Sequence, residues 1–145
     1  MIRLIPELRD RYGYFHTITT RWMDNDVYGH ANNTVYYSYF DTLVNQFLID
    51  RGAMDIAQSL VIGLVVETAC QYFSPVAFPD RVHAGLRVGK LGRTSVRYEI
   101  GIFRNNEPAA SAQGHFVHVY VDRITRRPTP LPQELLVALK PLLQP

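Results

Sequence analysis

One short run of the chain holds most of the side chains that could do chemistry. It reads RWMDNDVYGHANNTVY from position 21, and its polar or reactive side chains include Asp24, Asp26, His30, Asn32 and Asn33. A carboxylate can attack a carbonyl carbon or take a proton from water, and a histidine can act as acid or base near neutral pH. The run is therefore a candidate hydrolytic site.

The neighbouring elements place this run at the start of a helix. Residues 14–21 (YFHTITTR) are aromatic and β-branched, which is typical of a strand. From position 34 to about 51, apolar residues recur at three-to-four spacing, which indicates a helix with one apolar face, and Gly52 is its expected C-cap. The first N–H groups of a helix lack partners within it. Polar side chains and free amide donors are thus expected together.

That combination suits the hydrolysis of a thioester. The reaction needs a nucleophile, or a base for water, and positive potential where the carbonyl oxygen becomes an anion. The leaving thiol has a pKa near about 8.5, so it departs as thiolate without a strong acid. The sequence has no convincing Ser-His-Asp or Cys-His signature. One carboxylate and a helix N-terminus are the expected machinery.

The remainder of the sequence predicts strands and a small helix. Strands are expected at 60–73, 81–88, 94–103 and 110–121, the first of them strongly buried and all four in hairpin succession. Pro75 and Pro79 separate the first two, residues 89–92 and 105–108 form connections, and 132–139 is a short helix with proline in its first turn. The long helix must bury its stripe against this sheet. The predicted class is α+β, in a single domain spanning 1–145.

The segment RWMDNDVYGHANNTVYYSYF resembles the signature of the 4-hydroxybenzoyl-CoA thioesterase family of hotdog-fold acyl-CoA thioesterases. The strand and turn pattern of YFSPVAFPDRV, VGKLGRTSV and HFVHVYVDRITRRPTPLP extends the resemblance over most of the chain. The resemblance implies a hotdog fold, with a five-stranded antiparallel sheet wrapped around one long central helix and a short C-terminal helix. The order of elements alone would also suit other α+β folds.

The resemblance implies hydrolysis of an acyl-CoA thioester to free acid and coenzyme A. In that family the second aspartate of a D-x-D pair is catalytic, and it corresponds to Asp26 here. The family's oxyanion donor is a backbone N–H at the helix start, which falls near Asn33. His30 is expected either to polarise substrate or water or to brace the loop, and Asp24 to be structural.

Further positions of the motif are candidates for substrate binding. Gly29, Asn32 and Tyr36 stand at the family's spacing, although Asn32 is equally suited to capping the helix. Many family members read GHVNN and continue YFExAR, whereas this chain has Ala31, Asp41 and Val44 at the differing positions. The acyl group of the substrate therefore stays open.

Basic side chains lie at two predicted turns. Lys90 and Arg93 are candidates for binding the phosphates of coenzyme A, and solvated turn charges are the equally weighted alternative. Arg123, Arg126 and Arg127 form a second cluster with the same two readings.

Composition excludes several classes of function. A net charge of +2 is too small to predict sequence-independent nucleic-acid binding, and the longest apolar run, 60–66, is far short of the ~20 residues that cross a bilayer. The single cysteine, Cys70, cannot form an internal disulfide, and the N-terminus lacks the apolar core of a secretory signal, so a cytoplasmic location is expected. His115 and His118 point to opposite faces of a strand, so no metal site is predicted, and no cofactor is implied beyond the coenzyme A of the substrate.

Three alternatives to an acyl-CoA thioesterase stay open. The substrate could be an acyl carrier protein thioester, the enzyme could be a hotdog hydratase or dehydratase, or the domain could bind acyl thioesters without turnover. The asparagine-proline insertion usual in those hydratases is missing from this sequence. Because related hotdog sites are completed across subunits, a homodimer or homotetramer is expected.

Overall fold

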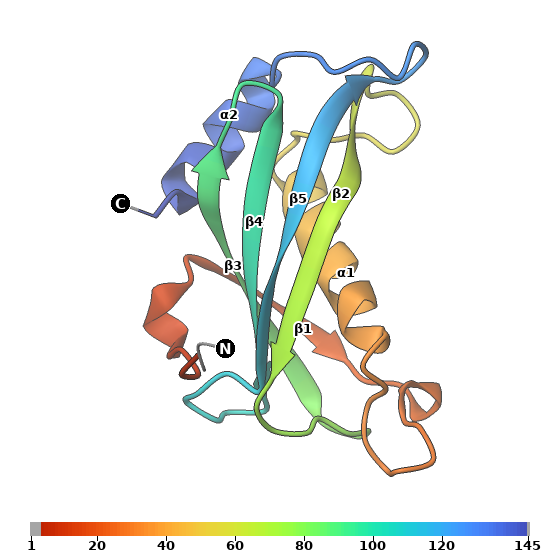
Figure 1. Cartoon of the computed structure of the whole chain (residues 1–145), viewed down its shortest axis with the longest axis vertical. Coiled ribbons are helices and arrows are strands. Elements are labelled where there is room, and N and C mark those ends of the chain that lie inside the picture. The colour runs from red at the N-terminus through yellow and green to blue at the C-terminus, as the bar shows by residue number, and fades with distance from the viewer. Residues whose placement is uncertain (1–3, 145) are drawn as a thin grey trace.

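A curved antiparallel sheet surrounds one long helix in the computed structural model, which describes residues 4–144 (Figure 1). The strands and helices are β1 (Tyr14–Thr19), α1 (Val35–Asp50), β2 (Val61–Tyr72), β3 (Arg81–Leu91), β4 (Ser95–Arg104), β5 (Ala112–Asp122) and α2 (Gln133–Leu139). Single-turn 3-10 helices lie at Arg9–Arg11, Trp22–Asp24 and Lys140–Leu142. The predicted hotdog arrangement is confirmed.

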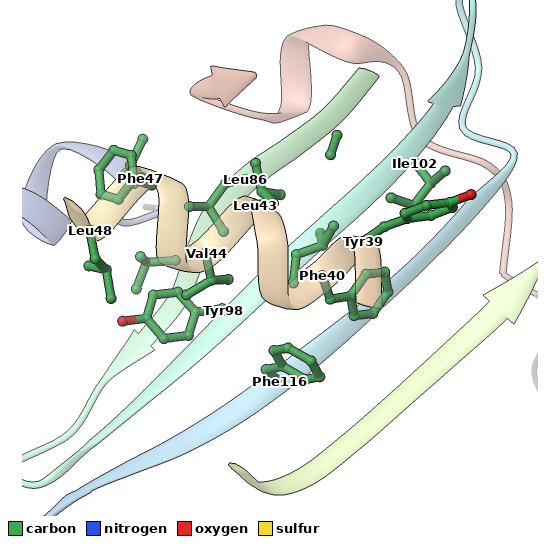
Figure 2. Close-up of a cluster of buried hydrophobic side chains, with 14 of the residues drawn as sticks. Tyr39, Phe40, Leu43, Val44, Phe47, Leu48, Leu86, Tyr98, Ile102 and Phe116 are labelled. Carbon is green, nitrogen blue, oxygen red and sulfur yellow. The ribbon is translucent and has the colours of Figure 1, made fainter. Parts of the chain in front are cut away.

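The core lies between α1 and the concave face of the sheet. On β3 and β4, every second residue is fully buried: Val82, Ala84, Leu86 and Val88, then Val96, Tyr98, Ile100 and Ile102. The buried face of α1 consists of Tyr36, Tyr39, Phe40, Leu43, Val44, Phe47 and Leu48. Figure 2 shows Leu86, Tyr98 and Ile102 of the sheet facing the side chains of α1. The predicted alternation of the strands and the apolar stripe of the helix are both confirmed.

The end of α1 lies one residue before the predicted position, since the C-cap is Arg51 and Gly52 follows it. Gly52 has a φ of +69°, a left-handed conformation that glycine adopts without steric cost. Its N–H donates to the Ile49 carbonyl at 3.0 Å, which closes the last turn.

The predicted burial of β2 is wrong. This strand is the edge of the sheet, paired only with β5, and most of its side chains are exposed in the chain. An apolar strand sequence is found both at the centre of a sheet and at an edge that another molecule covers. The pattern therefore predicts that the strand is covered, but not by which part of which molecule.

The predicted hairpin succession is wrong at its first step. The sheet order is β1-β3-β4-β5-β2, so β2 and β3 lie apart, and residues 73–80 carry the chain between them. The connection predicted at 89–92 is shorter than expected, because β3 continues through Leu91 with an irregularity between Val88 and Lys90. A bulge accommodates an extra residue without ending the strand. Gly92, whose N–H donates to the Ser95 carbonyl at 2.8 Å, begins the turn.

The two histidines of β5 lie on opposite faces, as predicted. His118 is buried among aromatic rings beneath α1, whereas His115 bonds to Glu67 at 2.7 Å on the outer face. Within residues 4–144, no group of three or more His, Cys, Asp or Glu side chains has a metal-binding arrangement. None of the helices in that part of the chain is long and apolar enough to span a membrane.

Candidate active site

Asp24 anchors the loop that carries the motif. Its carboxylate is 1% exposed and accepts hydrogen bonds from the Tyr39 hydroxyl at 2.9 Å and from the Arg21 backbone N–H at 2.9 Å. The guanidinium of Arg21 donates to the other carboxylate oxygen, with Nε at 3.0 Å and Nη2 at 2.9 Å. A buried carboxylate requires such partners. Asp24 therefore has the predicted structural role, joining the end of β1 to helix α1.

Asp26 stands on a tight turn that follows this anchor. Its N–H donates to the His30 carbonyl at 3.0 Å, and its carbonyl accepts from the Gly29 N–H at 3.1 Å. Gly29 has a φ of +87°, which explains the glycine at this turn. Oδ1 of Asp26 accepts the Tyr28 N–H at 2.8 Å, and within residues 4–144 this is the only hydrogen-bond partner of the carboxylate. The turn orients one carboxylate oxygen and leaves the other available.

The start of α1 is held by Asn32. Its side-chain Oδ1 accepts both the Thr34 N–H at 3.0 Å and the Thr34 hydroxyl at 2.8 Å, and its carbonyl accepts the Val35 N–H at 2.9 Å. The bond to the Thr34 N–H forms an Asx turn directly before the helix, whose N-cap residue is Thr34. In the described part of the chain, the neighbouring Asn33 N–H has no acceptor. A free donor therefore lies where an oxyanion donor is expected.

A pocket of about 380 Å³ opens beside this helix start. Its walls are His30, Ala31, Asn33 and Tyr36 from the motif, and Tyr72, Phe73, Ser74 and Pro75 from the end of β2. The rings of Tyr36 and Tyr72 meet edge to face, with centroids 4.9 Å apart. Burial raises the pKa of Tyr36 to about 12, so its phenol stays neutral near pH 7. The pocket is therefore a partly apolar cavity with a few polar groups, as small-molecule sites commonly are.

The structure gathers only part of the predicted set at this pocket. His30, Asn33 and Tyr36 line it, while Asp26 and Gly29 lie on the adjoining turn and the Asn32 side chain bonds to Thr34. The His30 ring has a long contact of 3.4 Å from Nδ1 to the Ala31 carbonyl and is exposed. It is accessible from solvent.

Lys90 and Arg93 lie far from the pocket within one chain. Lys90 lies near the end of β3 and Arg93 in the turn between β3 and β4, at the end of the sheet opposite the motif loop (Figure 1). The second basic cluster, Arg123, Arg126 and Arg127, follows β5. The last residue of β5 pairs with the first residue of β2, whereas the pocket lies at the last residue of β2. Eleven residue steps of β2 span about 35 Å. The guanidinium of Arg123 already has partners within the chain, since it donates to the Ser59 carbonyl at 2.6 Å and to the Ile56 carbonyl at 2.8 Å.

Sequence reasoning missed the wall formed by residues 72–75. Its position depends on β2 lying at the sheet edge beside the helix start, a contact between segments almost 40 residues apart. The Tyr72 hydroxyl donates to the Asn33 carbonyl at 3.0 Å across that distance in sequence. Pro75 marked a break after the strand, but no local signal tied this segment to the motif.

Comparison with known proteins identifies the family. The model of the thioesterase-like superfamily matches residues 20–139, which include the motif loop, α1 and the whole of the remaining sheet. The chain belongs to the thioesterase-like superfamily. A search of curated protein sequences gave no match.

Solved structures agree with this membership. The PA5185 protein of Pseudomonas aeruginosa shares 52% identity and a TM-score of 0.94, with 97% of this chain and 98% of that one covered. The PA2801 protein of the same organism, described as a candidate thioesterase, shares 28% identity and a TM-score of 0.79 over 91% and 98%. A 1,4-dihydroxy-2-naphthoyl-CoA thioesterase from Synechocystis is similar in fold, with 16% identity and a TM-score of 0.79 over 87% and 94%. The general activity supported for this chain is thioester hydrolysis.

Proposed function

We propose that the protein hydrolyses acyl-CoA thioesters, releasing a free acid and coenzyme A, at the pocket beside the start of α1. The observation that carries the proposal is that the pocket is lined by Asn33, whose N–H has no acceptor within residues 4–144, and by His30, whose carbonyl accepts the N–H of Asp26. Membership of the thioesterase-like superfamily supports the reaction class, and the named substrate of the Synechocystis relative supports a coenzyme A ester.

The proposed chemistry needs no side chain beyond this segment. Asp26 either attacks the thioester carbonyl carbon or takes a proton from the water that attacks it. The carbonyl oxygen becomes an anion, which the Asn33 N–H and the positive end of the α1 dipole stabilise. The C–S bond then breaks and coenzyme A leaves as thiolate. In the case of direct attack, water hydrolyses the mixed anhydride that Asp26 forms with the acyl group.

A thiol-release assay tests the reaction and its alternatives. Purified protein is incubated with benzoyl, medium-chain and long-chain thioesters of coenzyme A and of acyl carrier protein. Turnover of the coenzyme A esters supports the proposal, whereas turnover of the carrier-protein esters alone reassigns the substrate. Tight binding without thiol release would make the domain a binding module. In a separate assay with an enoyl-CoA, hydration of the double bond without thiol release would make it a hydratase.

Asp26→Asn tests the mechanism. The amide has nearly the shape of the carboxylate but is neither a good nucleophile nor a base, so kcat should fall by about 10²–10⁴-fold or more. The matched control is Asp24→Asn, which removes the neighbouring carboxylate of the same motif and should weaken folding more than turnover. Near-normal turnover by Asp26→Asn would reject the mechanism and make His30 the next residue to replace.

We also propose that the active form contains a second copy paired along β2. In one chain this edge leaves backbone N–H and C=O groups and the valine side chains at 65 and 66 uncovered. Antiparallel pairing of two β2 edges would bring the far end of one sheet to the pocket of the other. The distance between the basic clusters and the pocket of one chain supports this arrangement.

Lys90 and Arg93 are proposed to hold the phosphates of coenzyme A in such an assembly. Each charge-assisted bond contributes about 1.5–3 kcal/mol if desolvated, and less if exposed. The change of both to alanine should raise KM for acyl-CoA much more than for a pantetheine thioester, which lacks the nucleotide phosphates. The matched control is Arg126 and Arg127 changed to alanine, the second basic cluster. An equal change in KM for both substrates, or no change, would leave Lys90 and Arg93 with a structural role only.

A further inference from the structure

The peptide group between Asn33 and Thr34 is held at both of its ends. Its carbonyl accepts the Tyr72 hydroxyl at 3.0 Å, and its N–H donates to Oδ1 of Asn32 at 3.0 Å. Two hydrogen bonds on opposite sides of one planar group fix its rotation. Residue 33 is therefore restrained on its C-terminal side.

The preceding peptide group, which contains the Asn33 N–H, is held at one end only. Its oxygen, the Asn32 carbonyl, accepts the Val35 N–H at 2.9 Å. In a trans peptide the N–H points away from the carbonyl, so this bond directs the Asn33 N–H away from the helix. Within residues 4–144 that N–H has no acceptor, and Asn33 lines the pocket.

These bonds differ in origin. The bonds among Asn32, Thr34 and Val35 lie within the motif segment, whereas the bond to the Asn33 carbonyl comes from Tyr72, the last residue of β2. Its hydroxyl therefore ties the orientation of residue 33 to the sheet. Burial raises the pKa of Tyr72 above its ordinary value, so the hydroxyl stays protonated and remains a donor. Its ring is fixed by the edge-to-face contact with Tyr36.

We infer that Tyr72 is a positioning residue for thioester hydrolysis, which holds the Asn33 N–H in the direction required to stabilise the oxyanion. The inference rests on the proposed function. Tyr72 acts through the Asn33 carbonyl and takes no part in proton transfer. A donor must be held before the reaction because its contribution depends on alignment with the charge that develops in the transition state.

The test is Tyr72→Phe in the full chain, which removes the hydroxyl and keeps the ring. We expect kcat for acyl-CoA to fall about tenfold while KM changes less than about twofold, because a misaligned donor weakens binding of the transition state more than that of the substrate. The shape of the pH profile of kcat should not change. Exchange of the amide hydrogens of residues 33 and 34 should become faster.

Tyr14→Phe is the matched control, since Tyr14 packs against Phe47 near the other end of α1 and lies away from the pocket. It should leave kcat, KM and amide exchange at the helix start unchanged. The Tyr72→Phe protein should unfold at nearly the temperature of the wild type, which separates positioning from a general loss of folding.

Other outcomes would overturn the inference. An unchanged kcat in Tyr72→Phe, with an active wild type, rejects the role of Tyr72 and leaves the proposed function intact. Loss of the alkaline limb of the pH profile would instead make the hydroxyl an acid catalyst. An equal rise in KM and fall in kcat/KM would make it a substrate-binding group. A wild type that releases no thiol from any ester rejects the proposed function, and the positioning role falls with it.

Discussion

Strands β4 and β2 have similarly apolar sequences and very different surroundings. On β4 the side chains of Val96, Tyr98, Ile100 and Ile102 are 0% exposed, whereas on β2 Leu64, Val65 and Val66 are 38%, 46% and 60% exposed. The first strand has neighbours on both sides and a helix above it, and the second has a neighbour on one side only. The difference shows that apolar patterning predicts whether a strand is covered, but does not say which chain covers it.

The largest expected change in the free energy of unfolding is at β4, the fully covered strand. Ile100→Ala should lower the free energy of unfolding by about 2–5 kcal/mol, because the cavity beneath α1 cannot collapse fully. Denaturant titration measures the change. Val137→Ala, an exposed apolar position of α2, is the control and should stay within about 0.5 kcal/mol of the wild type. A decrease in the free energy of unfolding of less than about 1 kcal/mol for Ile100→Ala would mean that β4 is no better packed than an edge strand.

His118 lies at the boundary between the two regions, since its β5 position pairs with Val65 of β2 and with Val96 of β4. Burial lowers its pKa to about 4, and its Nε2 has no hydrogen-bond partner within residues 4–144. The unfolded chain takes up this proton near about pH 6.5 and the folded chain only near pH 4. Stability should therefore be fully present above about pH 6.5 and decline by about 3 kcal/mol as the pH falls to 4.

His118→Phe should remove this part of the pH dependence. Phenylalanine retains an aromatic ring beside Tyr98 and Phe116 and has no group to protonate. Unfolding curves at pH 7, 5.5 and 4 give the comparison, and the difference between variant and wild type isolates His118 from every other titrating group. Parallel pH profiles for the two proteins would show that His118 is hydrated in the folded state.

The smallest effect on the stability of a single chain is expected at the exposed edge. Val66→Glu places a charge on a side chain that is already in water. The free energy of unfolding of the separated chain should therefore change by about 0.5 kcal/mol or less. The same charge should oppose pairing of two β2 edges, and light scattering should then report a monomer. Val137→Glu is the matched control and should keep the oligomer. A wild type that is monomeric and fully active at high dilution would contradict the proposed assembly.

Local patterns were sufficient for most of the fold. The stripe of α1, the alternation of β3 and β4 and the glycine at position 52 each reflect a rule that acts within a few residues. The sheet order was not predictable in this way, because Pro75 and Pro79 mark where β2 ends without saying which strand it joins. The length of β3 was misjudged because a glycine at a bulge looks the same in sequence as a glycine at a turn.

In the candidate site too, features within one segment were predicted and contacts between distant segments were not. Asp26 and Asn33 were singled out by the resemblance of one segment to the family's motif, and the structure gives Asp24 the anchoring role expected of it. Tyr72 was not found, because its hydrogen bond to the Asn33 carbonyl joins segments that meet only after the sheet forms. Lys90 and Arg93 lie at the end of the sheet opposite the motif loop, so their contact with coenzyme A stays a prediction that requires the proposed second chain.

The anchored loop has a consequence for protein engineering. Asn25 pairs with Ala31 across its base, and Asp24 fastens that base to Tyr39 and Arg21. Changes at the tip are thus insulated from the helix and the sheet, much as insertions in a closed surface loop are tolerated. The exposed side chains of Val27 and Tyr28 could be varied while the frame stays intact, whereas Gly29 must be kept for its left-handed φ. A library at these two positions would therefore alter the surface beside Asp26 without disturbing the bonds that hold the loop.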